Sequence, residues 1–151
     1  MSGEAPDPRT AAVRALELEF GSLMGMFRRI IAENADRLSP GMLPGVYKVF
    51  TVIARRESIT LSTLADVLAA DKGQTSRAVR ELEELGLVQR TPDPADRRSQ
   101  LISPTPMGLE RLAAARAPQE RSLLAALEDW SVDDIDDLAR MLRALAAGES
   151  P

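Results

Sequence analysis

Hydrophobic residues recur at three- and four-residue steps in two stretches near the ends of the chain. Ile135, Leu138, Met141, Leu142 and Leu145 form one such series, preceded by Ser131 as a helix cap. The other lies within residues 10–35 and consists of Val13, Leu16, Phe20, Leu23, Met24, Phe27, Ile30 and Ile31. This spacing places the apolar side chains on one face of a helix, so both stretches are predicted to be helical.

Shorter periodic segments fill the centre of the chain. The pattern predicts helices at 44–54 and 62–69, a short strand at 59–61, and strands at 87–90 and 101–103 around a proline- and aspartate-rich turn at 92–98. A further helix starts after Pro104 and Pro106, and Pro118 is expected to kink or restart it.

The segment 71–104 is the most informative part of the sequence. Asp71 is placed to cap a helix, with Gln74 at the capping-box spacing, and Gly86 stands where a left-handed helix stop needs a residue without Cβ. The start of this helix is polar and basic, and a basic hairpin follows it. This arrangement is typical of a winged helix-turn-helix, so the predicted fold is mainly α with a small β wing (α+β).

Composition narrows the chemistry. The chain has no cysteine and no histidine, which removes disulfides, thiol redox switches, zinc fingers and cysteine or serine–histidine hydrolases. We therefore expect no enzymatic activity, no metal and no cofactor. No apolar run approaches the roughly 20 residues of a membrane helix. The start, MSGEAPDPRT, lacks the basic and apolar regions of a signal peptide, so we expect a cytoplasmic protein without a membrane partner.

Charge is unevenly distributed along the sequence. The net charge is −4, but residues 128–137 contain six acidic and no basic residues. Residues 55–98 are balanced, with basic groups concentrated where a DNA contact is expected: Lys72, Arg77, Arg80, Arg90, Arg97 and Arg98. Because local charge governs contact with a polyanion, overall acidity does not argue against DNA binding.

The elements divide the chain into functional segments. We expect a flexible tail at 1–9 and a single domain at 10–151. Within this domain, 44–104 would be the winged-helix head, and 10–35 and 106–148 would be dimerisation helices. The apolar faces of these terminal helices exceed what one head can cover, so pairing with a second copy is predicted. The alternative is that the ends fold back on their own head.

Residues 59–108 resemble the MarR family of bacterial transcription regulators. The matching motifs are ITLSTLA at 59–65, DKGQTSR at 71–77, LEELGLVQR at 82–90, and the wing DPADRRS at 93–99 with its acidic-x-Arg pair Asp96 and Arg98. The resemblance implies a triangular homodimer with interleaved chain ends, a recognition helix in the major groove and a wing in the minor groove. It also implies that Arg98 enters the minor groove, and that Asp96 orients the wing by pairing with a basic residue of the head, for which Arg77 is the candidate.

Particular side chains are therefore expected to carry function. Amides, hydroxyls and guanidinium groups suit base edges and phosphates, so the predicted DNA-binding residues are Lys72, Gln74, Thr75, Ser76, Arg77, Arg80, Arg97 and Arg98. By resemblance to the family, a small aromatic or anionic ligand is expected in a cleft lined by Met24, Phe27, Tyr47 and Phe50. Since Met and aromatic residues at helical spacing are more often part of a core, that reading competes with simple packing.

Two classes of function fit these features. The first is a homodimeric regulator, acting as a repressor, that binds double-stranded DNA at a palindromic operator and is released by a small ligand. The second is a winged-helix adaptor that binds protein instead of DNA. An adaptor would be expected to have replaced the polar helix start and the wing arginines, and both are present here.

Overall fold

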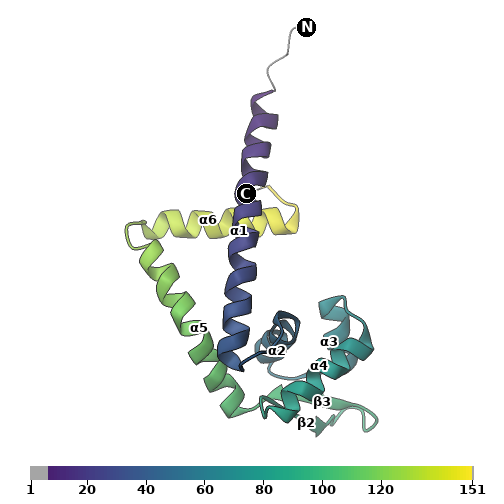
Figure 1. Ribbon diagram of the computed structural model, residues 1–151. Helices are drawn as coiled ribbons and strands as arrows, with labels where there is room; N and C mark the ends of the chain where they lie inside the picture. The colour runs from purple at the N-terminus through teal and green to yellow at the C-terminus, as the bar shows by residue number, and fades with distance from the viewer. Residues whose placement is uncertain (1–6, 151) are drawn as a thin grey trace. The chain divides into compact units, whose positions relative to one another are not determined.

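The computed structural model describes residues 7–150 and separates them into two compact units, with the boundary between Ala115 and Arg116 (Figure 1). Within these residues there are six helices and a three-stranded antiparallel sheet. The predicted class, mainly α with a small β wing, is confirmed.

The first helix, α1, spans Pro8–Leu38 and is longer than the predicted 10–35. Pro8 and Arg9 were predicted to belong to a tail, but they form the first helical turn, where the fixed φ of proline is favourable. Asp7 precedes this helix, and the rest of the predicted tail, residues 1–6, lies outside the described residues. Only the last turns of α1 are buried, through Asn34, Ala35 and Leu38.

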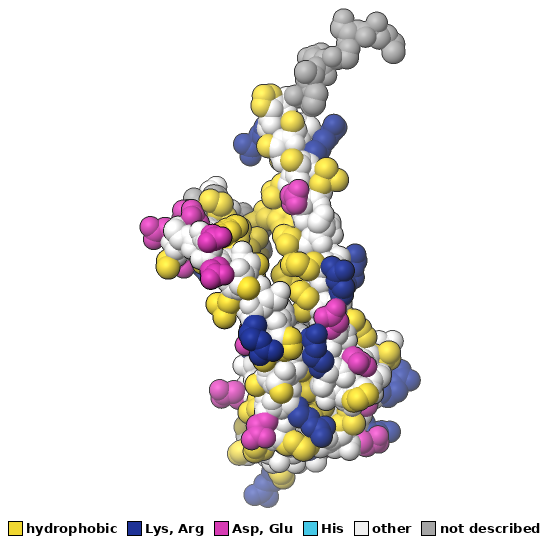
Figure 2. All heavy atoms as spheres, turned by 60° about the vertical axis from the view of Figure 1, so that its left-hand side comes forward, with side chains coloured by type: hydrophobic (Ala, Val, Ile, Leu, Met, Phe, Trp, Pro, Cys, Tyr) yellow, Lys and Arg dark blue, Asp and Glu magenta, His cyan; other side chains and the backbone are white. Residues whose placement is uncertain are grey.

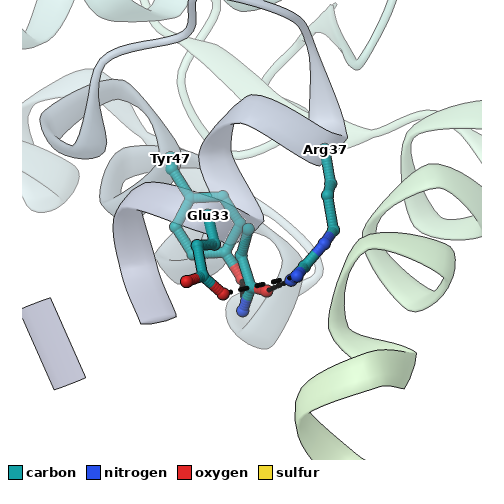
Figure 3. A network of polar contacts seen from close by, with 4 residues as sticks. Glu33, Arg37 and Tyr47 are labelled. Carbon is teal, nitrogen blue, oxygen red and sulfur yellow. Dashed lines mark hydrogen bonds and ion pairs between the residues drawn. The ribbon is translucent and has the colours of Figure 1, made fainter. Parts of the chain in front are cut away.

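A polar network joins the end of α1 to α2, which spans Pro44–Arg56 (Figure 3). The buried Asn34 side chain donates to the Tyr47 hydroxyl at 3.4 Å and accepts from Arg37 at 3.1 Å. Arg37 also pairs with Glu33 at 3.3 Å. Because a buried amide must be hydrogen-bonded, this network fixes where α1 meets α2. Nothing in the hydrophobic pattern predicted it.

The core of the first unit is built around α2. Val46, Val49, Phe50 and Ile53 recur at helical spacing and are all buried, with Phe50 and Ile53 fully inaccessible to solvent. They pack with Leu64 of α3, Val79 and Leu82 of α4, and Ile102 of the sheet in a single hydrophobic cluster. The first unit therefore closes a core of its own.

Helices α3, Leu61–Leu68, and α4, Lys72–Glu84, form the helix-turn-helix. Thr60 caps α3 by accepting from the Thr63 N–H at 3.2 Å. The turn between the helices passes through Ala69, which adopts the left-handed conformation at φ 48° and ψ 40°. Asp71 then caps α4 as predicted, its carboxylate accepting from the Gln74 N–H at 3.0 Å.

The sheet contains β1, Ile59–Thr60, β2, Val88–Pro92, and β3, Gln100–Pro104, in the order β1-β3-β2. Strand β2 pairs with β3 in a register that sets Arg90 opposite Ile102. Gly86 separates α4 from this hairpin at φ +72°, which confirms the predicted left-handed stop. The hairpin is the wing and extends from the end of α4 (Figure 1).

Helix α5 spans Pro106–Ala126, and α6 spans Val132–Ala147. Of the two outcomes predicted at Pro118, a kink or a restart, the restart does not occur, because α5 runs as one helix through this residue. Gly108 lies against the wing: a Cβ there would be 2.3 Å from the Leu87 carbonyl oxygen. Ser131 caps α6 as predicted, accepting from the Asp134 N–H at 3.1 Å.

None of the helices within residues 7–150 combines the length and apolarity needed to cross a membrane.

Candidate nucleic-acid interface

The start of α4 presents a polar surface to solvent. Lys72, Gln74, Arg77 and Arg80 are exposed and Ser76 is half-buried. Their positions follow from the amphipathic pattern of α4, which turns Val79 and Leu82 into the core and leaves the opposite side free. This face combines amide, hydroxyl and guanidinium groups on one rigid helix, which is the chemistry that reads base edges.

Thr75 is a correction to the predicted contact set. Its side chain is 2% exposed, and its hydroxyl donates to the Asp71 carbonyl at 2.9 Å. The reason is helical phase, since Thr75 lies four residues before Val79 and seven before Leu82 on the buried face. This spacing was visible in the sequence. Thr75 therefore stabilises the first turn of α4 instead of facing DNA.

The wing tip is ordered by its own aspartates. Asp93 accepts from the Ala95 N–H at 2.9 Å, and Asp96 accepts from the Arg98 N–H at 3.0 Å. The Asp93 N–H donates to Ser99 and the Ser99 N–H to Asp96, which closes the turn. Arg97 and Arg98 are exposed on it. A short, internally bonded turn thus carries two guanidinium groups into solvent.

The pairing suggested for Asp96 and Arg77 is not formed in this structure. Asp96 uses its carboxylate on the wing backbone, and the ion pairs among residues 7–150 are Arg37–Glu33, Arg90–Glu83 and Arg140–Asp137. Aspartate often bonds a backbone N–H two residues ahead, and that local contact is made within the turn itself. Asp96 orders the wing, but through the Arg98 backbone.

The basic residues of α4 and of the wing turn form no ion pair with a carboxylate among the described residues. Within the described part of the chain, none of the salt bridges involves Lys72, Arg77, Arg80, Arg97 or Arg98. A protein surface with several unpaired cations binds anions, because each cation can displace a counterion from a polyanion. The positive charge on this head is therefore available to phosphates.

Arg90 differs from these five residues. Its Nε donates to Glu83 Oε2 at 2.9 Å, and its side chain is only 26% exposed. The sequence grouped it with the contact residues because it is basic and adjoins the wing. Strand alternation instead places Arg90 on the inner face of the sheet, because it lies two residues after the buried Val88.

The residues of the predicted ligand cleft lie in different environments. Phe50 is fully buried in the core and Tyr47 is 4% exposed, whereas Met24 and Phe27 on α1 are 55% and 45% exposed. Phe50 is therefore a core residue, as the alternative interpretation of simple packing predicted, because no part of its ring is accessible to a ligand. Met24 and Phe27 instead belong to an exposed apolar face of α1.

A helix-turn-helix followed by a hairpin, with free cations on both, defines this head as a winged helix-turn-helix. The sequence model of a family described as "MarR family" matches residues 41–99. A proposed transcriptional regulatory protein for the hcr operon of Thauera aromatica is 35% identical over 59% of this chain and 55% of its own length. The chain thus spans about half the length of this curated relative.

Solved structures extend the likeness beyond the head. A mutant MarR from E. coli, crystallised with operator DNA, is 25% identical with a TM-score of 0.57, covering 84% of this chain and 93% of its own. RV1404 from Mycobacterium tuberculosis shares the fold with a TM-score of 0.74 and 19% identity over 99% of each chain. These matches support assignment of the chain to the MarR family, and the curated relatives it matches are named as transcription regulators.

Proposed function

We propose that this protein is a sequence-specific DNA-binding transcription regulator that acts as a homodimeric repressor. The observation that carries the proposal is the set of unpaired basic residues on the α4 face and the wing tip of one folded head. A MarR structure with operator DNA and relatives named as transcription regulators support it. Nothing in the comparisons favours the adaptor alternative.

In this proposal α4 lies in the major groove and the wing reaches the minor groove. Gln74, Ser76 and Arg77 would contact bases or phosphates from the first turns of α4, and Lys72 and Arg80 would contact phosphates. Arg97 and Arg98 would act from the wing, with Asp96 holding the wing turn through the Arg98 N–H. Thr75 would not contact DNA, because its side chain is buried.

The dimer would form through the terminal helices. No residue of α6 is buried, and Leu138, Met141, Leu142 and Leu145 are each between 43% and 54% exposed. Hydrophobic side chains are likewise exposed along α1, where they line the long helix in yellow in Figure 2. Contiguous apolar surface of this kind mostly marks an interface. A two-fold dimer would require a two-fold operator.

A small aromatic or anionic ligand would act by changing the spacing of the two heads. It can do so only to the extent that it binds one spacing more tightly than the other. With Phe50 and Tyr47 buried, the exposed Met24 and Phe27 are the parts of the predicted cleft that remain accessible.

Selection of duplexes from a random DNA pool tests the DNA-binding proposal. The expected result is enrichment of imperfect palindromes whose half-site centres lie about 10 bp apart, with affinity falling steeply as salt rises. A pool that shows no enrichment after several rounds would refute sequence-specific binding. Enrichment of single, asymmetric half-sites would refute the dimer geometry.

A further inference from the structure

Arg90 occupies a position in the wing where a charged side chain is unexpected. It faces Ile102 across the β2–β3 ladder, and Ile102 is fully buried. Residues directly opposite each other in an antiparallel ladder point to the same side of the sheet. Val88, two residues earlier in β2, is also buried. Arg90 therefore points towards the helical side of the sheet, away from the solvent face that carries Gln89.

Glu83 meets Arg90 on that side. It lies four residues after the buried Val79 in α4, at the edge of the packed face. The two side chains, 26% and 31% exposed, meet at 2.9 Å between Nε and Oε2. The contact spans the Gly86 turn, so it joins the last turn of the recognition helix to the middle of the first wing strand.

The other bonds across this junction lie at the base of the wing. The Thr105 hydroxyl donates to the Gly86 carbonyl at 2.6 Å, and the Thr105 N–H donates to the Leu87 carbonyl at 3.0 Å. Both lie close to Gly86. Further out, β1 holds β3 through the Ile59–Ile102 and Thr60–Leu101 pairs, but these contacts do not link the middle of β2 to α4. Arg90 lies further out, three residues before Asp93, where the wing turn begins.

We propose that Glu83 and Arg90 are a positioning pair that sets the angle of the wing relative to the recognition helix. The inference rests on the proposed DNA-binding function and adds two residues to it. Arg90 acts through Glu83 and does not contact phosphate. Glu83 supports DNA binding although it carries a negative charge on the DNA-binding head.

Whether removal of the Glu83 carboxylate weakens or tightens DNA binding distinguishes a positioning role from simple charge repulsion. Removing a carboxylate near DNA reduces repulsion and should tighten binding, whereas removing a positioning residue should loosen it. Glu83→Ala is expected to weaken binding to a selected palindromic duplex by roughly five- to tenfold, since both heads of the dimer are affected. Glu84→Ala is the matched control, because Glu84 is the exposed neighbour on α4 and forms no ion pair in the described part of the chain.

Salt dependence identifies the role of Arg90. A positioning residue leaves the slope of log affinity against log salt unchanged when it is replaced, while each lost phosphate contact lowers it by about 0.9. Arg90→Ala is therefore expected to weaken binding with an unchanged slope. Binding by Glu83→Ala as tight as wild type, or a reduced slope for Arg90→Ala, would overturn the proposal. If Glu83→Ala lowers the folded fraction, the affinity measurement is repeated with Glu83→Gln, which removes the charge and keeps the side-chain length.

A measurement without DNA tests the wing angle directly. The chain has no cysteine, so spin labels can be attached at Ala95→Cys on the wing tip and Glu81→Cys on α4. The distance distribution between the labels should broaden in Glu83→Ala and stay narrow in Glu84→Ala. Equal distributions in the two variants would overturn the positioning role even if wild type binds DNA. If wild type selects no DNA at all, the proposed function fails while this distance test still stands.

Discussion

The winged-helix head and the terminal helix α6 have similar sequence patterns but opposite environments. In the head, the apolar residues of α2 are enclosed, with Phe50 and Ile53 fully buried. In α6, an equally regular series that includes Leu138 and Met141 contains no buried residue. The difference shows that the head completes its own core, whereas α6 needs another surface to cover its apolar face.

The largest effect should come from breaking the core of the head. Phe50→Ala removes a fully buried ring that packs with helices α3 and α4 and with the sheet, so it should lower the free energy of unfolding by about 3–5 kcal/mol. Chemical denaturation measures this. Leu43→Ala, at a residue that is 67% exposed, should change it by less than about 0.5 kcal/mol. Equal losses would mean that the head has no core of its own.

A charge in the exposed face of α6 should leave the head folded and dissociate the proposed dimer. Leu138→Glu is expected to give a monomer by sedimentation and to weaken binding to a palindromic duplex by about a hundredfold or more, because the second head no longer binds intramolecularly. Ala147→Glu adds the same charge on the opposite side of α6 and should remain dimeric. A dimeric Leu138→Glu protein would place the interface elsewhere.

Loss of a wing guanidinium should have a smaller effect. Arg98→Ala should reduce the logarithmic salt slope by about 0.9 for each head and weaken binding across many DNA sequences alike. Arg140→Ala, which removes an exposed arginine paired with Asp137 on α6, should leave the slope unchanged. If both variants kept the wild-type slope, Arg98 would make no phosphate contact.

The smallest effect on DNA binding is expected at Thr75. Thr75→Val keeps the shape of the buried side chain and removes only its hydrogen bond to the Asp71 carbonyl, at a cost of about 1 kcal/mol in stability. Affinity for DNA should be unchanged in an anisotropy titration. A loss comparable to that of Gln74→Ala would restore Thr75 to the contact surface.

Features set by local chemistry could be predicted from the sequence. The caps at Asp71 and Ser131 and the helix stop at Gly86 each depend on one side chain, or its absence, acting within a few residues. The order of helices and strands followed from periodicity, and the strands differ from prediction by only one or two residues at their ends.

Other features depend on longer contacts or on helical phase. Pro118 has no N–H to donate to the preceding turn, yet α5 runs through it to Ala126. The buried Asn34–Tyr47 contact joins residues thirteen apart on separate helices, and no spacing rule predicts it. Thr75 is buried and Arg90 is paired with Glu83, although both were predicted to face DNA, because that prediction considered their chemistry and not their helical or strand phase relative to buried neighbours.

Sedimentation equilibrium of the full chain, alone and with a selected palindromic duplex, shows whether the protein is a dimer and whether it binds DNA as one. We expect a dimer without DNA at micromolar concentration, and two chains on each duplex at saturation with one half-site for each head. A stable monomer that binds one chain per duplex with undiminished affinity would contradict this expectation.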